Sequence, residues 1–221
     1  MEKTQFSNNI WRYNKKFMLG FTTGKLDRKN RFGGEISSRW GASLVGGRNI
    51  HFHRNPIAGF LKIGMNLDFE ANYMNFEKGS GSFSDIINPD NYDDYENIPT
   101  LGEHYLTIGV AVGPTATFAP FYAFSNADLA ALRFRPYFRI TPSFASYIVS
   151  DEDDIEMHNA FALWYSAGLE IQWKRLIVGL GWKGSSAKYK GLVDDFLNEE
   201  SSSESYKFDV NMFNILIGVA F

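Results

Sequence analysis

The segment IAGFLKIGMNLDFEANYMNF, residues 57–76, alternates between apolar and polar side chains over most of its length. Ile63 and Phe69 belong to one face of an extended chain, and Lys62 and Asp68 belong to the other. A period of two residues indicates a β-strand, because a helix would scatter both sets around its circumference. At about 3.3 Å per residue the strand would be about 60 Å long, whereas strands of globular sheets usually have about five or six residues.

The same alternation recurs along the rest of the chain. Besides 57–76, we predict strands at residues 16–26, 34–50, 105–118, 131–148, 160–174, 176–185 and 206–221. The 221 residues have the length of a single domain, and no repeat or linker divides them. The sequence therefore predicts an all-β fold of eight antiparallel strands.

Composition excludes several classes of function. The chain has 22 Lys and Arg against 25 Asp and Glu, a net charge of −3, and no basic stripe suits nucleic acid. The lack of Cys excludes disulfides, thiolate metal sites and thiol catalysis. Although 44% of the residues are hydrophobic, no apolar run approaches the roughly 18 residues of a membrane-spanning helix. Alternating apolar surface fits a soluble all-β domain or a transmembrane β-barrel.

Three patterns favour the transmembrane barrel. The polar face of the strands combines small residues with charges of both signs, which suits a narrow lumen. Long loops at 77–103, 149–159 and 190–205 fall on one rim, and mostly short turns fall on the other. Aromatic residues gather near strand ends, as in the two interfacial girdles of such barrels. One girdle would comprise Phe118, Phe121, Tyr122, Phe124, Trp173 and Phe221, and the other Tyr73, Phe76, Phe144, Phe161 and Trp182.

The end of the chain carries the most specific resemblance. It reads FNILIGVAF, with Phe213, Ile215, Ile217, Val219 and Phe221 at every second position. This pattern resembles the terminal signal read by the outer-membrane insertion machinery, although the usual Tyr third from the end is Val219 here. The chain resembles small eight-stranded bacterial outer-membrane barrels, of the OmpA and OmpX kind and the PorT-like kind of Bacteroidetes. The resemblance implies an up-and-down barrel with short periplasmic turns and longer extracellular loops.

The resemblance also sets the expected organisation and surroundings. Residues 16–221 would form the outer-membrane barrel, and residues 1–15 a periplasmic tether. The first residues lack the apolar core of a signal peptide, so we presume that the signal peptide has been removed. The expected partners are outer-membrane lipid, lipopolysaccharide and a protein of an outer-membrane complex. No cofactor and no nucleic acid are expected.

Charged side chains on the polar face would project into the lumen. They are Lys62, Asp68, Glu70, Arg133, Arg135, Arg139, Glu170 and Lys183. Unpaired charge is costly in an interior too narrow for bulk water, so we predict that these groups pair and plug the barrel. A gated path for an ion or solute is the alternative.

The predicted long loops are rich in acidic residues. These are Asp85, Asp90, Asp93, Asp94 and Glu96, then Asp151, Glu152, Asp153, Asp154 and Glu156, then Asp194, Asp195, Glu199, Glu200 and Glu204. Their spacing matches no known calcium loop, so we predict solvated loops and no metal site. Tyr92, Tyr95 and Phe196 lie among them, a mixture that a partner-binding surface would also use.

Three prolines lie on two neighbouring predicted strands: Pro114, Pro136 and Pro142. Because proline lacks an N–H group, Pro136 and Pro142 would weaken the same seam of the wall. A lateral opening toward lipid resembles the proline-marked gaps of the lipid A palmitoyltransferase barrel, although that lumen is apolar and this one contains arginines. Strand bulges or strand ends are the alternative.

Catalytic motifs are sparse. The four histidines are His51 and His53 near the short-turn rim, and His104 and His158 near the long-loop rim, where Ser150 and Asp151 also lie. Geometry defines a Ser-His-acid triad, and this spacing does not supply it. We therefore predict no catalytic residues.

The leading hypothesis is a non-enzymatic barrel with a closed, salt-bridged lumen. It would act as a binding, scaffold or accessory subunit through its surface loops or its lipid-facing wall. The first alternative is an outer-membrane enzyme that modifies lipid A or another acyl chain. The second is a soluble lipocalin-like carrier with an apolar interior.

Overall fold

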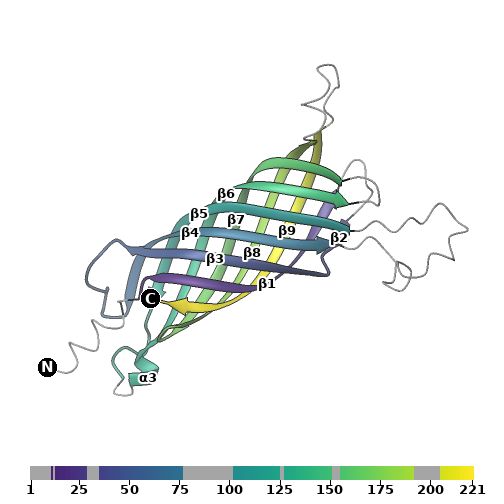
Figure 1. Cartoon of the computed structure of the whole chain (residues 1–221). Coiled ribbons are helices and arrows are strands. Elements are labelled where there is room, and N and C mark those ends of the chain that lie inside the picture. The colour runs from purple at the N-terminus through teal and green to yellow at the C-terminus, as the bar shows by residue number, and fades with distance from the viewer. Residues whose placement is uncertain are drawn as a thin grey trace, which may run out of the picture.

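A closed barrel of antiparallel strands forms the protein. The computed structural model describes residues 11, 13–28, 35–76, 102–124, 127–150, 155–191 and 205–221. The strands are β1 (Lys15–Arg28), β2 (Glu35–Ser37), β3 (Trp40–His51), β4 (Leu61–Phe76), β5 (Gly102–Phe118), β6 (Leu132–Ser150), β7 (Ile155–Trp173), β8 (Leu176–Gly191) and β9 (Ser205–Ala220). From β3 onward each strand pairs with the next, and β1 pairs with both β3 and β9, which closes the barrel (Figure 1). The predicted all-β, up-and-down antiparallel barrel is confirmed.

Strands β2 and β3 both pair with the same edge of β1 and together occupy one strand position in the wall. The barrel therefore counts as eight-stranded. Both pair with β1, but their registers differ by one residue, as at a β-bulge. Ser38 and Arg39 lie between them: Gly24 N donates to Ser38 Oγ at 2.7 Å, and Arg39 N donates to Asn75 O at 2.9 Å. The prediction of one unbroken strand at 34–50 was wrong at this bulge.

Other strand ends also differ from the prediction. β4 begins at Leu61 and not at residue 57, because Ile57 folds back to pair with Leu61 through a turn in which Gly59 has a φ of 82°. β6 and β7 pair as far as their ends, so the long loop expected at 149–159 shortens to 151–154. Backbone pairing continues there beyond the residues whose side chains alternate clearly.

The strand ends define two rims. At the turn rim, the segments 52–60, 119–131 and 174–175 join the strands, and β1 begins and β9 ends there. The segment 119–131 contains the one described helix, α3 (Ala127–Ala130). At the loop rim the strands are joined by 29–34, 77–101, 151–154 and 192–204, which lie outside the described residues. The side chains of the predicted acidic loops, with Tyr92, Tyr95 and Phe196, therefore lie outside the described residues.

No helix within the described part of the chain is long and apolar enough to cross a membrane.

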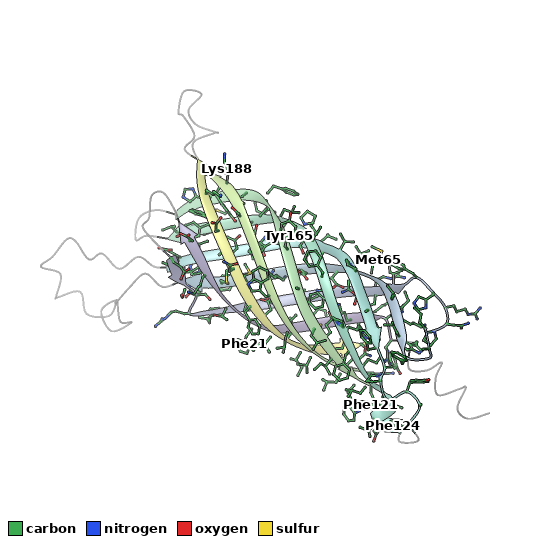
Figure 2. The ribbon with its side chains drawn as sticks, turned by 180° about the vertical axis from the view of Figure 1, so that it is seen from behind. Phe21, Met65, Phe121, Phe124, Tyr165 and Lys188 are labelled. Carbon is green, nitrogen blue, oxygen red and sulfur yellow. The ribbon has the colours of Figure 1, made fainter. Side chains whose placement is uncertain are left out.

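Apolar side chains cover the outer wall. Its exposed large side chains include Phe17, Phe21, Phe69, Val110, Phe138, Phe161, Trp182 and Ile217. Figure 2 shows Phe21 and Tyr165 on the outside of the barrel, and Phe121 and Phe124 beside the turn rim. The apolar face therefore points outward, as lipid requires, whereas a soluble carrier would turn it inward. Phe76 departs from its predicted place in a girdle, since its side chain is fully buried in the lumen.

Candidate functional site in the barrel lumen

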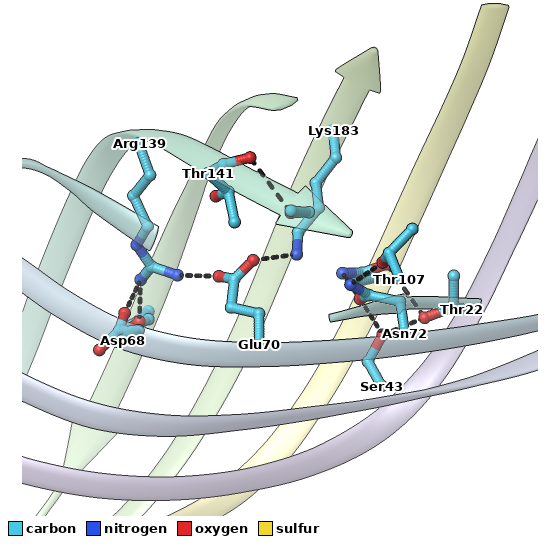
Figure 3. Close-up of polar contacts among 12 residues, drawn as sticks. Thr22, Ser43, Asp68, Glu70, Asn72, Thr107, Arg139, Thr141 and Lys183 are labelled. Carbon is cyan, nitrogen blue, oxygen red and sulfur yellow. Dashed lines mark hydrogen bonds and ion pairs between the residues drawn. The ribbon is translucent and has the colours of Figure 1, made fainter. Parts of the chain in front are cut away.

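Six of the eight predicted lumen charges meet in one ion-pair network. Its members are Asp68, Glu70, Arg135, Arg139, Glu170 and Lys183, together with Lys16. Arg139 is the hub: its Nη1 lies 3.0 Å from Glu70 Oε1, and its Nη2 lies 2.6 Å from Glu170 Oε1 and 3.2 Å from Asp68 Oδ2. Figure 3 shows Arg139 between Asp68 and Glu70, with Lys183 on the far oxygen of Glu70.

Two further contacts complete the network. Arg135 Nη1 lies 3.4 Å from Glu170 Oε2, and the guanidinium of Arg139 lies 3.6 Å from the ring centroid of Tyr137. All seven charged members are buried. Buried charges of opposite sign stabilise one another only while both partners are present, so the loss of one member would leave its partners uncompensated in the lumen.

Lys16 is the member that the sequence did not reveal. Its Nζ lies 2.9 Å from Asp68 Oδ2 and also contacts Glu170. Lys16 shares the inward face of β1 with Met18 and Leu26, which are also fully buried. Because apolar residues lie on the inward face of β1 as well as on the outward face, its alternation is weak in the sequence. Strict alternation along the strand would still have placed Lys16 in the lumen.

A neutral hydrogen-bonded layer lies beside the charges. Ser43 Oγ donates to Asn72 Oδ1 at 2.8 Å, Asn72 Nδ2 donates to Thr107 Oγ1 at 3.0 Å, and Thr22 Oγ1 donates to Asn214 Oδ1 at 3.1 Å. Thr22 and Ser43 also share a hydrogen bond (Figure 3). Five strands thus contribute one polar side chain each to a layer that fills the lumen beside the ion pairs.

The loop-rim end of the lumen is apolar and aromatic. The cluster comprises Leu26, Met74, Phe76, Tyr105, Ala145, Tyr147, Ala160, Ala162, Trp164, Tyr189, Phe208, Val210 and Met212. The Tyr105 and Tyr189 hydroxyls hydrogen-bond at 2.6 Å, and the Tyr147 hydroxyl donates to Glu103. The predicted charges do not extend to this end, where aromatic side chains of the inward parity pack together.

Lys62 and Arg133 are the two predicted lumen charges that lie outside the network. Both side chains are buried, at 8% and 2% exposure. Lys62 Nζ lies 4.9 Å from the ring centroid of Trp11, and the Arg133 guanidinium carbon lies 6.0 Å from it. Trp11 belongs to the predicted tether, so part of that segment reaches the lumen; the role of residues 1–15 stays a prediction.

The three prolines coincide with gaps in one ladder of the wall. All three side chains point outward. Between β5 and β6 the partners run without interruption from Gly102↔Ser150 to Gly109↔Ser143, and beyond that only at Val112↔Ile140, Thr115↔Tyr137 and Phe118↔Phe134. Between β6 and β7 every residue has a partner. The missing N–H groups therefore fall between β5 and β6, and an opening of this seam toward lipid stays a prediction.

We expect Pro136→Ala to tighten this seam. The new N–H group can donate to the facing carbonyl of β5, and a hydrogen bond contributes about 1 kcal/mol. Hydrogen exchange at the neighbouring amides of β5 and β6 should slow about five-fold. Pro120→Ala, at an exposed turn-rim position, is the control and should leave that exchange unchanged. Equal exchange in all three proteins would show that proline does not weaken the seam.

The histidines do not converge on one site. His104 lies on the outer face of β5, where its Nδ1 is 2.8 Å from the Tyr73 hydroxyl. His158 lies on the lumen face of β7, stacked on Tyr147 with ring centroids 6.3 Å apart. The barrel wall thus separates the two histidines expected near the loop rim. The side chains of Ser150 and Asp151 lie outside the described residues.

The turn-rim histidines hold the ends of strands. His53 Nδ1 lies 2.6 Å from Asn55 O, and its Nε2 accepts the backbone N–H of Ile63 at 2.9 Å. His51 Nε2 lies 3.3 Å from Thr117 Oγ1. Among the described residues, no group of three His, Asp or Glu side chains is arranged to hold a metal ion.

The residues of the predicted insertion signal share one face of the wall. Phe213, Ile215, Ile217, Val219 and Phe221 are each between 42% and 59% exposed, on the outer face of β9 and at its end. Recognition of this face by the insertion machinery stays a prediction.

Known proteins share the architecture of this chain but little of its sequence. No family model and no curated protein matches it. The structure of Ail, the attachment invasion locus protein of Yersinia pestis, in complex with the heparin analogue sucrose octasulfate has a TM-score of 0.52 and 12% identity, over 95% of this chain and 99% of that one. Neisserial surface protein A has a TM-score of 0.49 and 10% identity, over 94% and 97% of the two chains. The outer-membrane protease OmpT of Escherichia coli has a TM-score of 0.43 and 7% identity, over 94% of this chain and 96% of that one.

At these identities the likeness to Ail shows the fold alone. The outer wall of the barrel is apolar, so it requires lipid around it and not water. The chain is an eight-stranded β-barrel of the outer-membrane type, and its wall places it in a bacterial outer membrane.

Proposed function

We propose that the protein is a non-enzymatic binding or accessory subunit of the outer membrane that acts through its outer surface. The observation that carries this proposal is the filled lumen. Ion pairs around Arg139, the amide and hydroxyl layer around Asn72, and the aromatic cluster around Tyr105 follow one another inside the barrel. A solute would have to displace all three, so the surfaces left for function are the loops and the lipid-facing wall.

The charge distribution supports the loops as the binding surface. The charges of the ion-pair network around Arg139 neutralise one another, whereas the three acidic segments of the sequence lie in and around the loop-rim connections, mixed with Tyr92, Tyr95 and Phe196. Aromatic residues are enriched at protein interfaces, and charges of one sign steer the encounter with a partner. A partner with a basic surface fits this composition.

We expect no conductance above background in planar bilayers. The ion pairs around Arg139 and the hydrogen-bonded layer around Asn72 cross the lumen, and a passing ion would have to displace them at a cost. The measurement compares purified protein with empty detergent at matched concentrations. Reproducible unitary steps that depend on the protein would contradict a closed lumen and favour the gated-path alternative.

The function itself is tested by purification from the native outer membrane in gentle detergent. A tagged wild-type chain should retain one protein in stoichiometric amount. A variant with Asp85, Asp90, Asp93, Asp94 and Glu96 replaced by the matching amides should lose it, because the acidic charge of the loop is gone. Lys188→Gln, an exposed change at the outer end of β8, is the control and should retain it. A wild-type chain that carries only lipid would contradict an accessory role.

A further inference from the structure

The turn-rim mouth of the lumen gathers basic side chains from neighbouring strands. Lys62 of β4 pairs in register with Thr117 of β5, and the Thr117 hydroxyl lies 3.3 Å from His51 Nε2 of β3. Arg133 of β6 lies across the same ring of Trp11 as Lys62. Trp11 also meets His51 edge to face, with ring centroids 6.1 Å apart. We call Lys62, Arg133, His51 and Thr117 the basic mouth.

The basic mouth has positive charge that the rest of the lumen does not neutralise. The three carboxylates of the network, Asp68, Glu70 and Glu170, already contact Lys16, Arg135, Arg139 and Lys183. Within the described part of the chain, neither Lys62 nor Arg133 forms an ion pair with a carboxylate. Two like charges buried around one ring repel each other, and such an arrangement favours a counter-anion.

Arg133 also presents an unused hydrogen-bond donor. Its side chain is 2% exposed, and its Nε has no hydrogen-bond partner among the described residues. A guanidinium edge matches the oxygens of a tetrahedral oxyanion, and a lysine ammonium adds a point charge. The Thr117 hydroxyl supplies a further donor beside them.

We propose that the basic mouth binds a phosphate group, held by Arg133 and Lys62 and covered by the ring of Trp11. A phosphate carries between one and two negative charges near neutral pH, which matches the two cations that lack a carboxylate. The group can come from free phosphate or from a phospholipid headgroup at the membrane surface, since the site lies at the rim of the barrel.

Titration calorimetry with inorganic phosphate, on the full chain in an uncharged maltoside detergent at low ionic strength, tests the proposal. Saturable binding is expected for the wild type. Arg133→Gln and Lys62→Gln should each weaken it at least ten-fold. Arg48→Gln, on the outer face of β3, and Lys188→Gln are exposed controls of the same type and should bind as the wild type does. Heat-dependent gel mobility shows that each variant is folded.

Two further readouts locate the group and its source. Phosphate should change the tryptophan emission of the wild type and not that of Trp11→Phe. Competition by phosphatidylglycerol in mixed micelles would assign the site to a lipid headgroup, and its absence would assign it to free phosphate. The proposal is overturned by a wild type that shows no saturable phosphate binding. It is equally overturned if the Gln variants at 62 and 133 bind as tightly as the controls, or if Trp11→Phe keeps the emission change.

Discussion

Glu170→Gln is expected to destabilise the folded barrel by about 3–5 kcal/mol, the usual cost of removing one partner of a buried ion pair. Glu170 contacts three cations, Lys16, Arg135 and Arg139, and its side chain is 3% exposed. The amide would leave those cations with Asp68 and Glu70 alone, in an interior that solvates charge poorly. Urea unfolding in lipid vesicles, followed by gel mobility without heating, measures the change.

The control for this prediction is the exposed pair of Lys25 and Glu35. Their charged atoms lie 2.6 Å apart, but the two side chains are 59% and 53% exposed. Glu35→Gln should cost less than about 1 kcal/mol, because water screens such a pair. The double change Lys16→Met with Glu170→Leu removes one charge of each sign and should recover at least half of the loss. Equal losses for Glu170→Gln and Glu35→Gln would refute the stabilising role of the network.

Gly20→Ala should prevent the barrel from closing properly. Gly20 lies in β1 opposite Leu216 of β9, and a Cβ atom added there would be 1.9 Å from the carbonyl oxygen of Ile215. The obstacle is backbone, so a side-chain rotation cannot relieve it. We expect a loss of about 3 kcal/mol or more, at the upper end of the range for overpacking. The folded, fast-migrating form on unheated gels measures it.

Gly46→Ala is the matched control for Gly20→Ala. Gly46 lies in β3, and the nearest atom to an added Cβ is a ring carbon of Phe17 at 3.8 Å, an ordinary van der Waals distance. This change should be neutral or slightly stabilising, because alanine restricts the unfolded chain more than glycine does. If Gly20→Ala is as stable as the wild type, the closing pair of strands tolerates the added atom and the prediction is wrong.

The alternation of side chains was sufficient to predict the fold, because lipid on one side and a narrow lumen on the other impose a period of two. The β-bulge at Ser38 and Arg39 was not predictable, since a one-residue change of register leaves the composition of a strand unchanged. The ends of β6 and β7 were misplaced because backbone pairing continues where apolar side chains stop. Ile57 was assigned to β4 because it is apolar and has the same parity as the outward-facing residues of that strand.

The sequence predicted which of these charged side chains face the lumen, but not which of them form ion pairs with each other. Parity along β4, β6 and β7 placed Asp68, Arg139 and Glu170 on the inward face, and their opposite signs predicted pairing. Which cation meets which carboxylate depends on the stagger between strands, which alternation does not contain. The same limit concealed the aromatic cluster at the loop rim. Inward aromatic residues such as Tyr147 look like any other residue of that parity.

The hairpin of β6 and β7 has a mechanical consequence for recognition. Phe144 and Phe161 face each other in register as the last bulky aromatic residues of its outer face, and the two strands stay paired from there to Ser150 and Ile155. At about 3.3 Å per residue, the hairpin extends about 20 Å past that pair. A partner that binds at the loop rim, as proposed above, would therefore meet strands that are already paired, and little conformational entropy would be lost in ordering them on contact.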